Sequence, residues 1–356
     1  MEKILLTTGG TGGHIFPALA VAEELRRRHP QAELLFMGAL YGPEARLAAQ
    51  AGLPFAGLPV RGLVGRGWRG AAAAAGLAAA CGQALARVRR FRPHVAIGFG
   101  SYAAFAPLLA ARLCGVPCVL HEQNAVAGAS NRLLGRLARR VCLSLEGTSG
   151  FAPEKCVLTG NPVRAAVAAA GERERTFTGR RLLVMGGSLG AHAINEYVVE
   201  HLAALREAGV EIRHQTGERD YDGVRAAYVA AGYDAGCVSA FMDDMGAAYA
   251  WADLALCRAG ATTVAELCAA GLPAMLIPFP YAAHDHQSGN AIALSRAGAA
   301  DWMAECRMRP DGLLTRLLAL IDAPDERRRM AEAARHAARP LAAAAVCDVL
   351  EGVARA

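Results

Sequence analysis

The residue types best suited to chemistry gather around two glycine-rich turns that lie about half the chain apart. The turn at 7–13 follows the apolar run 4–6, and the turn at 186–191 follows the apolar run 182–185. Each turn leads into a helical pattern, and a helix N-terminus offers unpaired N–H groups and a positive dipole end to an anionic ligand. The two turns therefore predict a ligand-binding cleft between two similar halves.

His14 directly follows the first glycine turn, at the expected start of a helix. A helix N-terminus disfavours imidazolium and keeps the ring neutral, so that it can accept a proton as a general base. The alternative is a histidine that only packs or caps the helix at this position. The residue types alone leave both interpretations open.

Polar side chains follow two further apolar runs of the first half. Residues 98–102 follow the run 95–97, and residues 121–124, His-Glu-Gln-Asn, follow the run 118–120. Both sets fall where strands are expected to end, which is the edge at which doubly wound sheets bind ligands. We interpret the adjacent histidine and glutamate as a buried hydrogen-bonded pair rather than as catalytic groups, and the lack of a second nearby histidine argues against a zinc site.

The second half contains the most specific polar cluster. Residues Gly260 to Thr263 are expected to begin a helix after an apolar strand, so their N–H groups can hold a diphosphate. Glu266, one turn further along, can accept two hydrogen bonds from a ribose diol, and Asp285 and Gln287 can hold sugar hydroxyls. The alternative for Glu266 is a solvated charge on the helix surface.

Two weaker patterns would favour other chemistry. Gly10-Thr11-Gly12 could begin a dinucleotide-binding motif, but Ile15 stands where the third glycine belongs. Asp220-Tyr221-Asp222 matches the D-x-D of metal-dependent transferases, but a polar loop produces this spacing by chance, and we interpret it as surface charge. The sequence thus predicts neither a nicotinamide cofactor nor a metal ion.

The elements that must position these residues are helices and parallel strands in alternation. Helical runs end at a glycine, an apolar residue and a proline at 52–54, 115–117 and 271–273, and a strand-like run follows each. Glycine supplies a left-handed helix cap and proline prevents continuation of the helix. Because the strands are continuously apolar, both faces of each sheet should be covered. We expect an α/β fold with doubly wound parallel sheets.

A chain of 356 residues favours two domains. The boundary is expected at 159–164, and the alanine-rich and charged stretch 165–175 is predicted to be a linker. The last apolar helix is expected to pack back on the first domain. The expected parts are residues 1–160, 161–339 and 340–356.

Composition, with 54% hydrophobic and 20% charged residues, is that of an ordinary globular protein. The net charge of +6 comes almost entirely from arginine, a pattern typical of codon bias, so we expect no nucleic-acid partner. Ten cysteines form no C-x-x-C pair, which favours reduced thiols in the cytoplasm. We expect no signal peptide, and no spanning helix because the longest apolar stretch, 71–86, is short and mostly alanine.

The ordered set of motifs resembles the MurG family of GT-B glycosyltransferases, which add N-acetylglucosamine to the lipid-linked muramoyl-pentapeptide of peptidoglycan synthesis. The match spans nearly the whole chain, and the ordered combination is specific. The residues that carry it are 9–17, 121–124 with Gly128, Asn131 and Arg132, 160–164, 186–188 with Gly190, Ala191 and Asn195, 258–266, and 285–287.

The resemblance implies a GT-B fold with two lobes facing a deep cleft, a UDP-N-acetylglucosamine site in the second domain and a lipid-diphosphate acceptor site in the first. Within the donor site, Phe241 and Met242 would border uracil, Arg164 and Ser188 would approach the diphosphate, and Asn124 and Gln287 the sugar. The implied donor-binding residues are Thr11, Gly12, Gly13, Asn124, Arg164, Ser188, Phe241, Met242, Ala261, Thr262, Thr263, Glu266 and Gln287. The implied acceptor-binding residues are Gly10, Gly13, His14, Gly100, Ser101, Tyr102, His121, Glu122 and Asn124.

The implied reaction is a single inverting displacement, in which the muramoyl 4-hydroxyl attacks the anomeric carbon and UDP leaves. His14 is the candidate base, and helix-end N–H groups with Arg164 would stabilise the leaving diphosphate without a dedicated metal or other cofactor. A relative that glycosylates diacylglycerol or another lipid, a sugar-nucleotide epimerase and a sensor without turnover are the competing interpretations.

Three positions depart from the family pattern. The family usually has a third glycine where Ser101 stands, often a glutamine where Leu189 stands, and often a glutamine or threonine at Ser288. The loop at 98–102 is therefore expected to lie slightly further from its ligand than in relatives.

The acceptor's lipid tail implies work at the cytoplasmic face of the cell membrane, as a peripheral protein on an anionic surface. The segment 60–69 supplies apolar and basic groups together, and Arg87, Arg89, Arg90 and Arg92 add charge nearby. A solvated charged face is the alternative.

Overall fold

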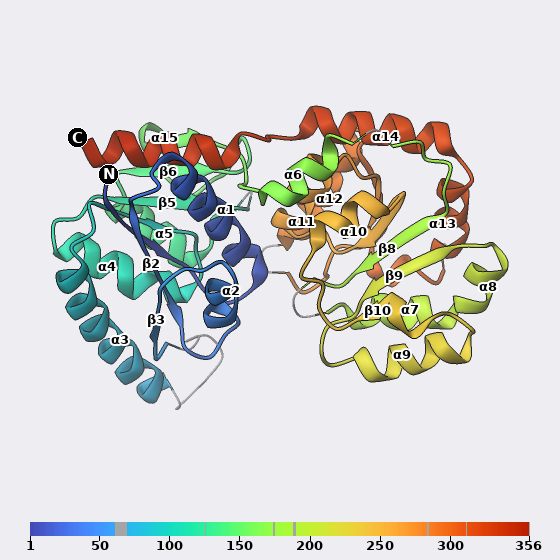
Figure 1. The fold of residues 1–356 in the computed structure, drawn as a ribbon, viewed down its shortest axis with the longest axis horizontal. Coiled ribbons are helices and arrows are strands. Elements are labelled where there is room, and N and C mark those ends of the chain that lie inside the picture. The colour runs from blue at the N-terminus through green and yellow to red at the C-terminus, as the bar shows by residue number, and fades with distance from the viewer. Residues whose placement is uncertain are drawn as a thin grey trace. The chain divides into compact units, whose positions relative to one another are not determined.

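The computed structural model describes residues 1–60, 70–124, 126–173, 175–187, 190–282, 285–310 and 312–355, with the backbone alone for 70–75. The chain forms two compact units. The first unit comprises Met1–Arg164 and Leu341–Ala356, and the second comprises Ala165–Pro340. Figure 1 shows that each unit is built on its own sheet.

The first unit has seven parallel strands in its described part, in the order β3-β2-β1-β4-β5-β6-β7. The strands are β1 (Lys3–Thr7), β2 (Glu33–Ala39), β3 (Phe55–Leu58), β4 (Val95–Gly98), β5 (Cys118–Glu122), β6 (Arg140–Leu143) and β7 (Cys156–Leu158). The helices are α1 (Gly12–Arg28), α2 (Glu44–Gln50), α3 (Gly70–Phe91), α4 (Phe105–Leu113), α5 (Ala129–Leu137) and α15 (Ala342–Arg355).

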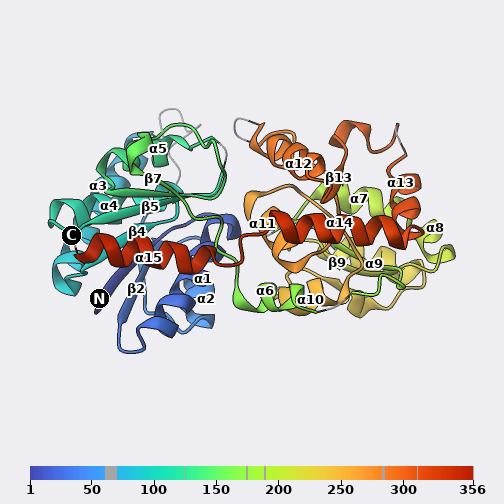
Figure 2. The ribbon, with the colours of Figure 1, turned by 90° about the horizontal axis from the view of Figure 1, so that it is seen from above.

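Alternate strand residues of the first unit face two helix layers, because successive side chains point to opposite faces of a sheet. Leu5, Ala96 and Leu120 belong to the hydrophobic core that contains residues of α3, α4 and α5. Helix α15 packs against α1 and against β4, β5 and β6 (Figure 2). The C-terminal helix thus completes the first unit, as expected.

The second unit has six parallel strands as far as the chain is described, in the order β10-β9-β8-β11-β12-β13. They are β8 (Arg181–Met185), β9 (Glu211–Gln215), β10 (Val238–Ser239), β11 (Leu254–Cys257), β12 (Ala274–Leu276) and β13 (Ala300–Trp302). The helices are α6 (Ala165–Gly171), α7 (His192–Glu200), α8 (Leu202–Glu207), α9 (Tyr221–Ala230), α10 (Met245–Trp251), α11 (Ala261–Ala270), α12 (His286–Arg296), α13 (Leu313–Ile321) and α14 (Pro324–Ala337).

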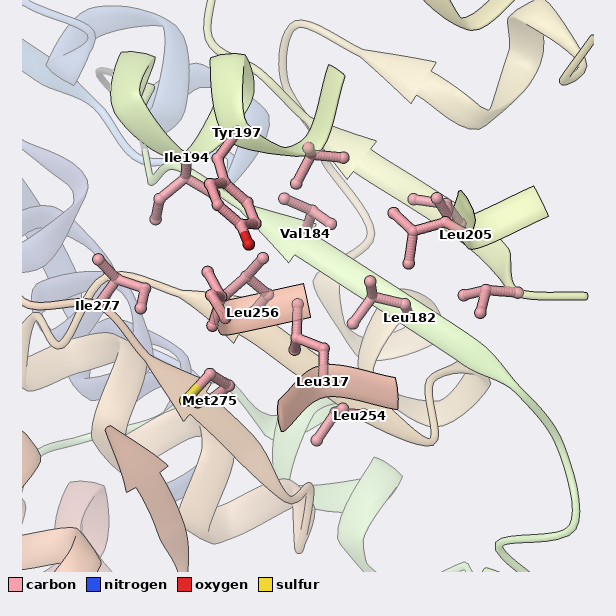
Figure 3. Close-up of a cluster of buried hydrophobic side chains, with 14 of the residues drawn as sticks. Leu182, Val184, Ile194, Tyr197, Leu205, Leu254, Leu256, Met275, Ile277 and Leu317 are labelled. Atoms are coloured by element: carbon pink, nitrogen blue, oxygen red, sulfur yellow. The ribbon is translucent and has the colours of Figure 1, made fainter. Parts of the chain in front are cut away.

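The core of the second unit lies between its strands and its helices. These helices come from both ends of the unit's sequence. Leu182 and Val184 of β8 and Leu256 of β11 gather with Ile194 of α7 and Leu317 of α13 (Figure 3). These side chains are fully or almost fully buried. The continuous apolar runs in the strands are therefore explained by burial of both sheet faces, and the predicted α/β class with doubly wound parallel sheets is confirmed.

The predicted junctions between helices and strands are confirmed. Gly52, Gly115 and Gly271 have φ angles of 64°, 77° and 56°, and strands β3, β5 and β12 begin shortly after the prolines that follow. An L-residue with a side chain rarely adopts this left-handed conformation, so glycine is required for the helix to end there.

The predicted linker at 165–175 is wrong for its first part. Residues Ala165–Gly171 form helix α6, which buries Val167 and Ala170 and packs against α10 and α11. Alanine is the best helix former, so the run folds as soon as it has a surface to pack on. Gly246 of α10 provides that surface, because a methyl group there would lie 2.6 Å from the backbone oxygen of Ala166.

Candidate active site

In the first unit, the two central strands β1 and β4 lie side by side, and the chain leaves them toward opposite ends of the sheet. Doubly wound sheets bind ligands at such a point, outside the carboxyl ends of the strands. The turn after β1 contains Gly10 and the turn after β4 contains Gly100, with φ angles of 88° and 91°. The fold thus brings together the turns at 7–13 and 98–102 that the sequence singles out.

His14 lies in the first turn of α1 and is partly exposed. Its Nδ1 is 3.0 Å from Oε1 of Gln123, which follows β5. Gly100 lies against the same ring, because a methyl group at Gly100 would be 3.2 Å from Cε1 and Nδ1 of His14. The structure therefore places His14 among three turns that come from β1, β4 and β5.

His121 and Glu122 are both buried, but they are not a pair with each other. As neighbours in β5 they point to opposite faces of the sheet, so their partners differ. Nε2 of His121 is 3.1 Å from the Gly160 oxygen and Nδ1 is 3.2 Å from Nε2 of Gln123. Burial lowers the pKa of His121 from 6.5 to about 4, so the ring is neutral at pH 7.

Glu122 holds two asparagines in place. Its Oε1 accepts hydrogen bonds from the backbone N and from Nδ2 of Asn124, at 3.0 and 3.1 Å. Its Oε2 accepts from Nδ2 of Asn131 at 2.8 Å. A carboxylate with three donors is well compensated for burial, and it fixes the side chain of Asn124 at the end of β5.

Ser101 and Tyr102 complete the turn after β4. Ser101 has φ 70° and ψ 158°, a conformation that residues other than glycine rarely adopt. Its hydroxyl faces the first turn, since a methyl group on Gly10 would lie 3.3 Å from the Ser101 oxygen. The Tyr102 side chain is 39% exposed. The residue that departs from the family pattern therefore adopts the backbone conformation that favours the family's glycine.

The start of α1 carries the remaining first-unit candidates. Thr11 is exposed and precedes Gly12 and Gly13, which begin the helix. The guanidinium of Arg164 lies 4.1 Å from the centre of the Phe16 ring, one turn along from Gly12. Arg164 thus belongs to the first unit and lies beside the helix N-terminus.

The second unit repeats the arrangement at β8 and β11, its two central strands. Gly187 and Gly190 in the turn after β8 have φ angles of 74° and 77°. Gln215, at the end of β9, donates from Nε2 to the oxygens of Gly187 and Ala240, at 2.8 and 3.3 Å. One side chain thereby ties the loops after β8, β9 and β10 together.

Phe241 and Met242 are partly exposed in the loop that follows β10. Of the donor candidates, Ser188 lies outside the described residues, as does Leu189.

Helix α11 begins at Ala261 after Gly260, with Thr262 buried and Thr263 partly exposed in its first turn. Glu266 lies in the next turn and is only 5% exposed. Its Oε2 accepts a hydrogen bond of 3.0 Å from the buried hydroxyl of Tyr249 in α10. The alternative of a solvated helix charge is therefore wrong, because the carboxylate is buried and held by a neighbouring helix.

Gln287, in the first turn of α12, accepts a hydrogen bond from the backbone N of Phe279 at 3.0 Å. Asp285 precedes that helix with φ 50° and accepts a hydrogen bond of 2.6 Å from the hydroxyl of Ser288. The loop 278–280 is further held by Arg258, which donates to the oxygens of Ile277 and Pro278, each at 3.2 Å. The candidate sugar-binding side chain is thus oriented through its amide oxygen.

The interpretation of Asp220 as surface charge is wrong. Its side chain accepts from Nδ2 of Asn195 at 2.8 Å and lies 3.0 Å from Nδ1 of His192, with only 13% of it exposed. This aspartate joins α7 to the start of α9. Among the described residues, no group of three or more histidine, cysteine, aspartate or glutamate side chains could hold a metal ion.

Sequence reasoning missed several residues that hold these loops. Glu44 is fully buried under the first turn and accepts a 2.9 Å hydrogen bond from the backbone N of Gly10. Tyr249 orients Glu266 in α11, Gln215 ties the second-unit loops together, and the motif at 121–124 does not reveal the role of Gln123. Gln215 could have been found, because it is a polar residue at the end of an apolar strand, but the roles of Glu44 and Tyr249 depend on tertiary packing.

The proposed membrane segment, residues 60–69, lies outside the described residues except for Val60, which is buried. In the described part of the chain, we find no helix with the length and hydropathy needed to cross a membrane. The Arg87 guanidinium donates to the oxygen of Gly57 at 2.6 Å, so this arginine anchors β3.

Comparisons with known proteins agree with this arrangement. Residues 4–143 match the glycosyltransferase family 28 N-terminal domain, and residues 181–346 match the glycosyltransferase family 28 C-terminal domain. The crystal structure of Acinetobacter baumannii MurG superposes with a TM-score of 0.75 and 33% identity, over 99% of this chain and 100% of that one. The UDP-GlcNAc 2-epimerase from Neisseria meningitidis shares the fold, with a TM-score of 0.69 at 12% identity over 98% of this chain and 100% of that one. The paired domains define the class as a GT-B glycosyltransferase.

A relative from Nitratidesulfovibrio vulgaris, strain Miyazaki F, is 55% identical over 99% of this chain and 97% of its own length. It is named UDP-N-acetylglucosamine--N-acetylmuramyl-(pentapeptide) pyrophosphoryl-undecaprenol N-acetylglucosamine transferase. The chain belongs to this family of transferases, the MurG family.

Proposed function

We propose that this enzyme transfers N-acetylglucosamine from UDP-N-acetylglucosamine to the 4-hydroxyl of the undecaprenyl-diphosphate-linked muramoyl-pentapeptide, with inversion at the anomeric carbon. The product is the disaccharide lipid of peptidoglycan synthesis, so lipid I becomes lipid II. The observation that carries this function is the 55% identity, over 99% of the chain, to a transferase named for these two substrates.

The acceptor binds at the first-unit turns after β1 and β4. The N-terminus of α1 lies there, and its positive dipole end suits the lipid diphosphate. The backbone N of Gly10 donates to Glu44, so that amide shapes the turn while the start of α1 faces the ligand. Ser101 and Tyr102 border the same turn. Because His121 and Glu122 are buried, they act by holding Gln123 and Asn124 rather than by touching the acceptor.

His14 accepts the proton of the attacking hydroxyl. Its position in the first turn of α1 favours the neutral ring over the imidazolium, so the ring can accept a proton. As the hydroxyl oxygen bonds to the anomeric carbon, its proton passes to His14 and the bond to the UDP oxygen breaks. UDP leaves with that electron pair.

The donor binds at the second-unit turns after β8, β10 and β11. The first turn of α11, with Ala261, Thr262 and Thr263, holds the diphosphate, and the carboxylate of Glu266 holds the ribose. Phe241 and Met242 border the uracil, and Gln287 contacts the sugar. Arg164 and Ser188 approach the diphosphate, Asn124 reaches toward the transferred sugar, and Thr11, Gly12 and Gly13 are the remaining donor-binding candidates.

The test is UDP release from UDP-N-acetylglucosamine with a lipid-diphosphate muramoyl-peptide, for the wild type and for His14→Ala. Loss of a general base costs about 10²–10⁴-fold in rate, and binding of UDP should be unchanged. His336→Ala, an exposed histidine on α14, is the matched control and should retain full activity. Normal turnover by His14→Ala would reject the base assignment.

A panel of acceptors tests the reaction itself. The muramoyl-peptide lipid should support UDP release, while diacylglycerol and buffer alone should not. Release with diacylglycerol would favour a different lipid transferase, isomerisation of the donor without acceptor would favour an epimerase, and donor binding without any release would favour a sensor.

The enzyme acts as a peripheral protein at the cytoplasmic face of the membrane, because its acceptor is anchored there by a lipid. Each basic residue near an anionic surface contributes about 1 kcal/mol, so a few arginines of the segment 60–69 and of the end of α3 would give reversible attachment. Flotation with anionic vesicles should recover the protein at low salt and release it at high salt. Equal recovery with neutral vesicles would contradict the electrostatic contribution.

A further inference from the structure

We infer that Gln123 is a positioning residue that fixes the tautomer of His14, with the proton on Nδ1 and the lone pair on Nε2. The inference rests on the proposed role of His14 as the base, and it identifies Nε2 as the nitrogen that accepts the proton. It follows from a chain of hydrogen bonds that begins and ends on backbone carbonyl oxygens, which can only accept.

The first carbonyl fixes the orientation of the Gln123 amide. One end of that amide lies 2.9 Å from the Phe99 oxygen, so this end must be the nitrogen, which donates. The other end, the amide oxygen Oε1, then faces His14. Gln123 is 2% exposed, so water does not replace these partners.

The second carbonyl fixes the proton on His121 and agrees with the first. Nε2 of His121 is 3.1 Å from the Gly160 oxygen and must donate to it. Because burial lowers the pKa of this ring to about 4, the ring has only that one proton at pH 7. Its Nδ1 therefore accepts, and the second N–H of the Gln123 amide donates to it over 3.2 Å.

With both N–H groups of Gln123 directed away, its oxygen can only accept from His14. The contact of 3.0 Å therefore requires a proton on Nδ1 of His14, which leaves the lone pair of the neutral ring on Nε2. When the muramoyl hydroxyl attacks, its proton goes to Nε2, and Nδ1 keeps its proton and its bond to Gln123. No further proton has to move in the chain.

The direct test is ¹⁵N NMR of the full chain with labelled histidine, with the His14 signals assigned by their loss in His14→Gln. The expected spectrum shows a protonated Nδ1 and an unprotonated Nε2 at pH 7. An unrestrained neutral imidazole prefers the proton on Nε2, so a protonated Nε2 and bare Nδ1 would overturn the inference. This measurement uses the wild type and does not depend on whether any variant folds.

Gln123→Met removes the acceptor while keeping the length of the side chain. The His14 proton should then shift toward Nε2, and kcat should fall about tenfold, less than the roughly 10²–10⁴-fold that loss of the base itself costs. KM for UDP-N-acetylglucosamine should stay the same. Gln31→Met, at an exposed position after α1, is the matched control and should leave the His14 signals and kcat unchanged.

The two possible failures are distinguishable. Full activity of His14→Ala would remove the base itself, and with it the function inferred for Gln123. An inactive His14→Ala with an unchanged tautomer and kcat in Gln123→Met would leave the base in place and overturn only the role of Gln123.

Discussion

Ser101 has a backbone conformation that suits a residue with a side chain poorly. Its φ of 70° with ψ of 158° lies in a region that is populated almost entirely by glycine, and such strain costs about 1–3 kcal/mol. The family that the sequence resembles usually has a glycine at this position. The strain is therefore local to one residue, and the surrounding structure holds it in place.

Ser101→Gly should stabilise the protein by about 1 kcal/mol, because the relieved strain exceeds the extra chain entropy that glycine loses on folding. The midpoint of denaturant unfolding should rise accordingly. Ser295→Gly, within helix α12, serves as the control and should destabilise the protein by about 0.5–1 kcal/mol. A lower unfolding midpoint for Ser101→Gly would show that the hydroxyl contributes more than the strain costs.

Tyr249→Phe should weaken donor binding without unfolding the second unit. The variant removes the hydroxyl that orients the Glu266 carboxylate, a hydrogen bond of about 0.5–1.5 kcal/mol, so Kd for UDP should rise several-fold. Calorimetric titration with UDP measures the change. Tyr233→Phe, which loses only a bond to the Val210 oxygen, should bind UDP as the wild type does.

At this scale the sequence predicts which residues cluster but not how they are oriented. His14 could be found because it follows a glycine turn at a helix start. Its bond to Gln123 spans 109 positions, so no local pattern reveals it. The burial of Glu266 likewise depends on Tyr249 in another helix, which is why a solvated charge was a reasonable alternative.

Among the elements, the turn between β8 and α7 contains two glycines whose backbones are constrained in different ways. Gly190 has a positive φ, and a methyl group there would lie 2.3 Å from the backbone oxygen of Thr216. Gly187 has a similar φ, but such a methyl group there would have no neighbour within 4 Å in the described part of the chain. A side chain at Gly187 would therefore meet backbone strain alone, while a side chain at Gly190 would meet both backbone strain and a steric clash.

Gly190→Ala should destabilise the second unit clearly more than Gly187→Ala. The Gly187 variant incurs about 1 kcal/mol of left-handed strain, while the Gly190 variant adds a clash with backbone that cannot move aside. Urea unfolding followed by circular dichroism compares them. Equal losses would mean that the loop after β9 yields easily to the added methyl group.

Strands and their junctions could be predicted because glycine, proline and apolar runs act locally. Helix α6 could not be predicted, since its alanine-rich composition also fits a linker. The difference lies in Gly246, whose missing side chain lets α6 approach α10. A contact between distant segments thus decides whether the alanine run forms a helix or an irregular linker.

Across the whole molecule, the chain closes on itself through α15. Arg28 at the end of α1 bonds to Asp348 at 2.6 Å and to Glu351 at 3.3 Å, and His29 lies 3.0 Å from Glu351. Burial alone would raise the pKa of Glu351, but the bonds from His29 and Arg28 outweigh it and the pKa is lowered. Val346, Leu350 and Val353 fix the same helix through their apolar side.

Glu351→Gln should loosen α15 at neutral pH and make little difference in acid. A carboxylate whose folded pKa is lowered stabilises the fold above its unfolded pKa of about 4.5, and this contribution is lost as the pH falls from that value through the lower folded pKa. The expected cost at pH 7 is about 1 kcal/mol. Hydrogen exchange of the α15 amides at several pH values measures it, with the exposed Glu146→Gln as control; a cost that persists at pH 3 would point to packing instead of charge.

The return of the chain to its first unit also has a consequence for synthesis on the ribosome. Every strand described in the two sheets is translated before Leu341, yet the side of β4, β5 and β6 that α15 covers is still bare at that moment. The unit that emerges first is therefore completed only after the second unit has been translated, and the nascent chain must keep this apolar surface in solution until α15 leaves the exit tunnel.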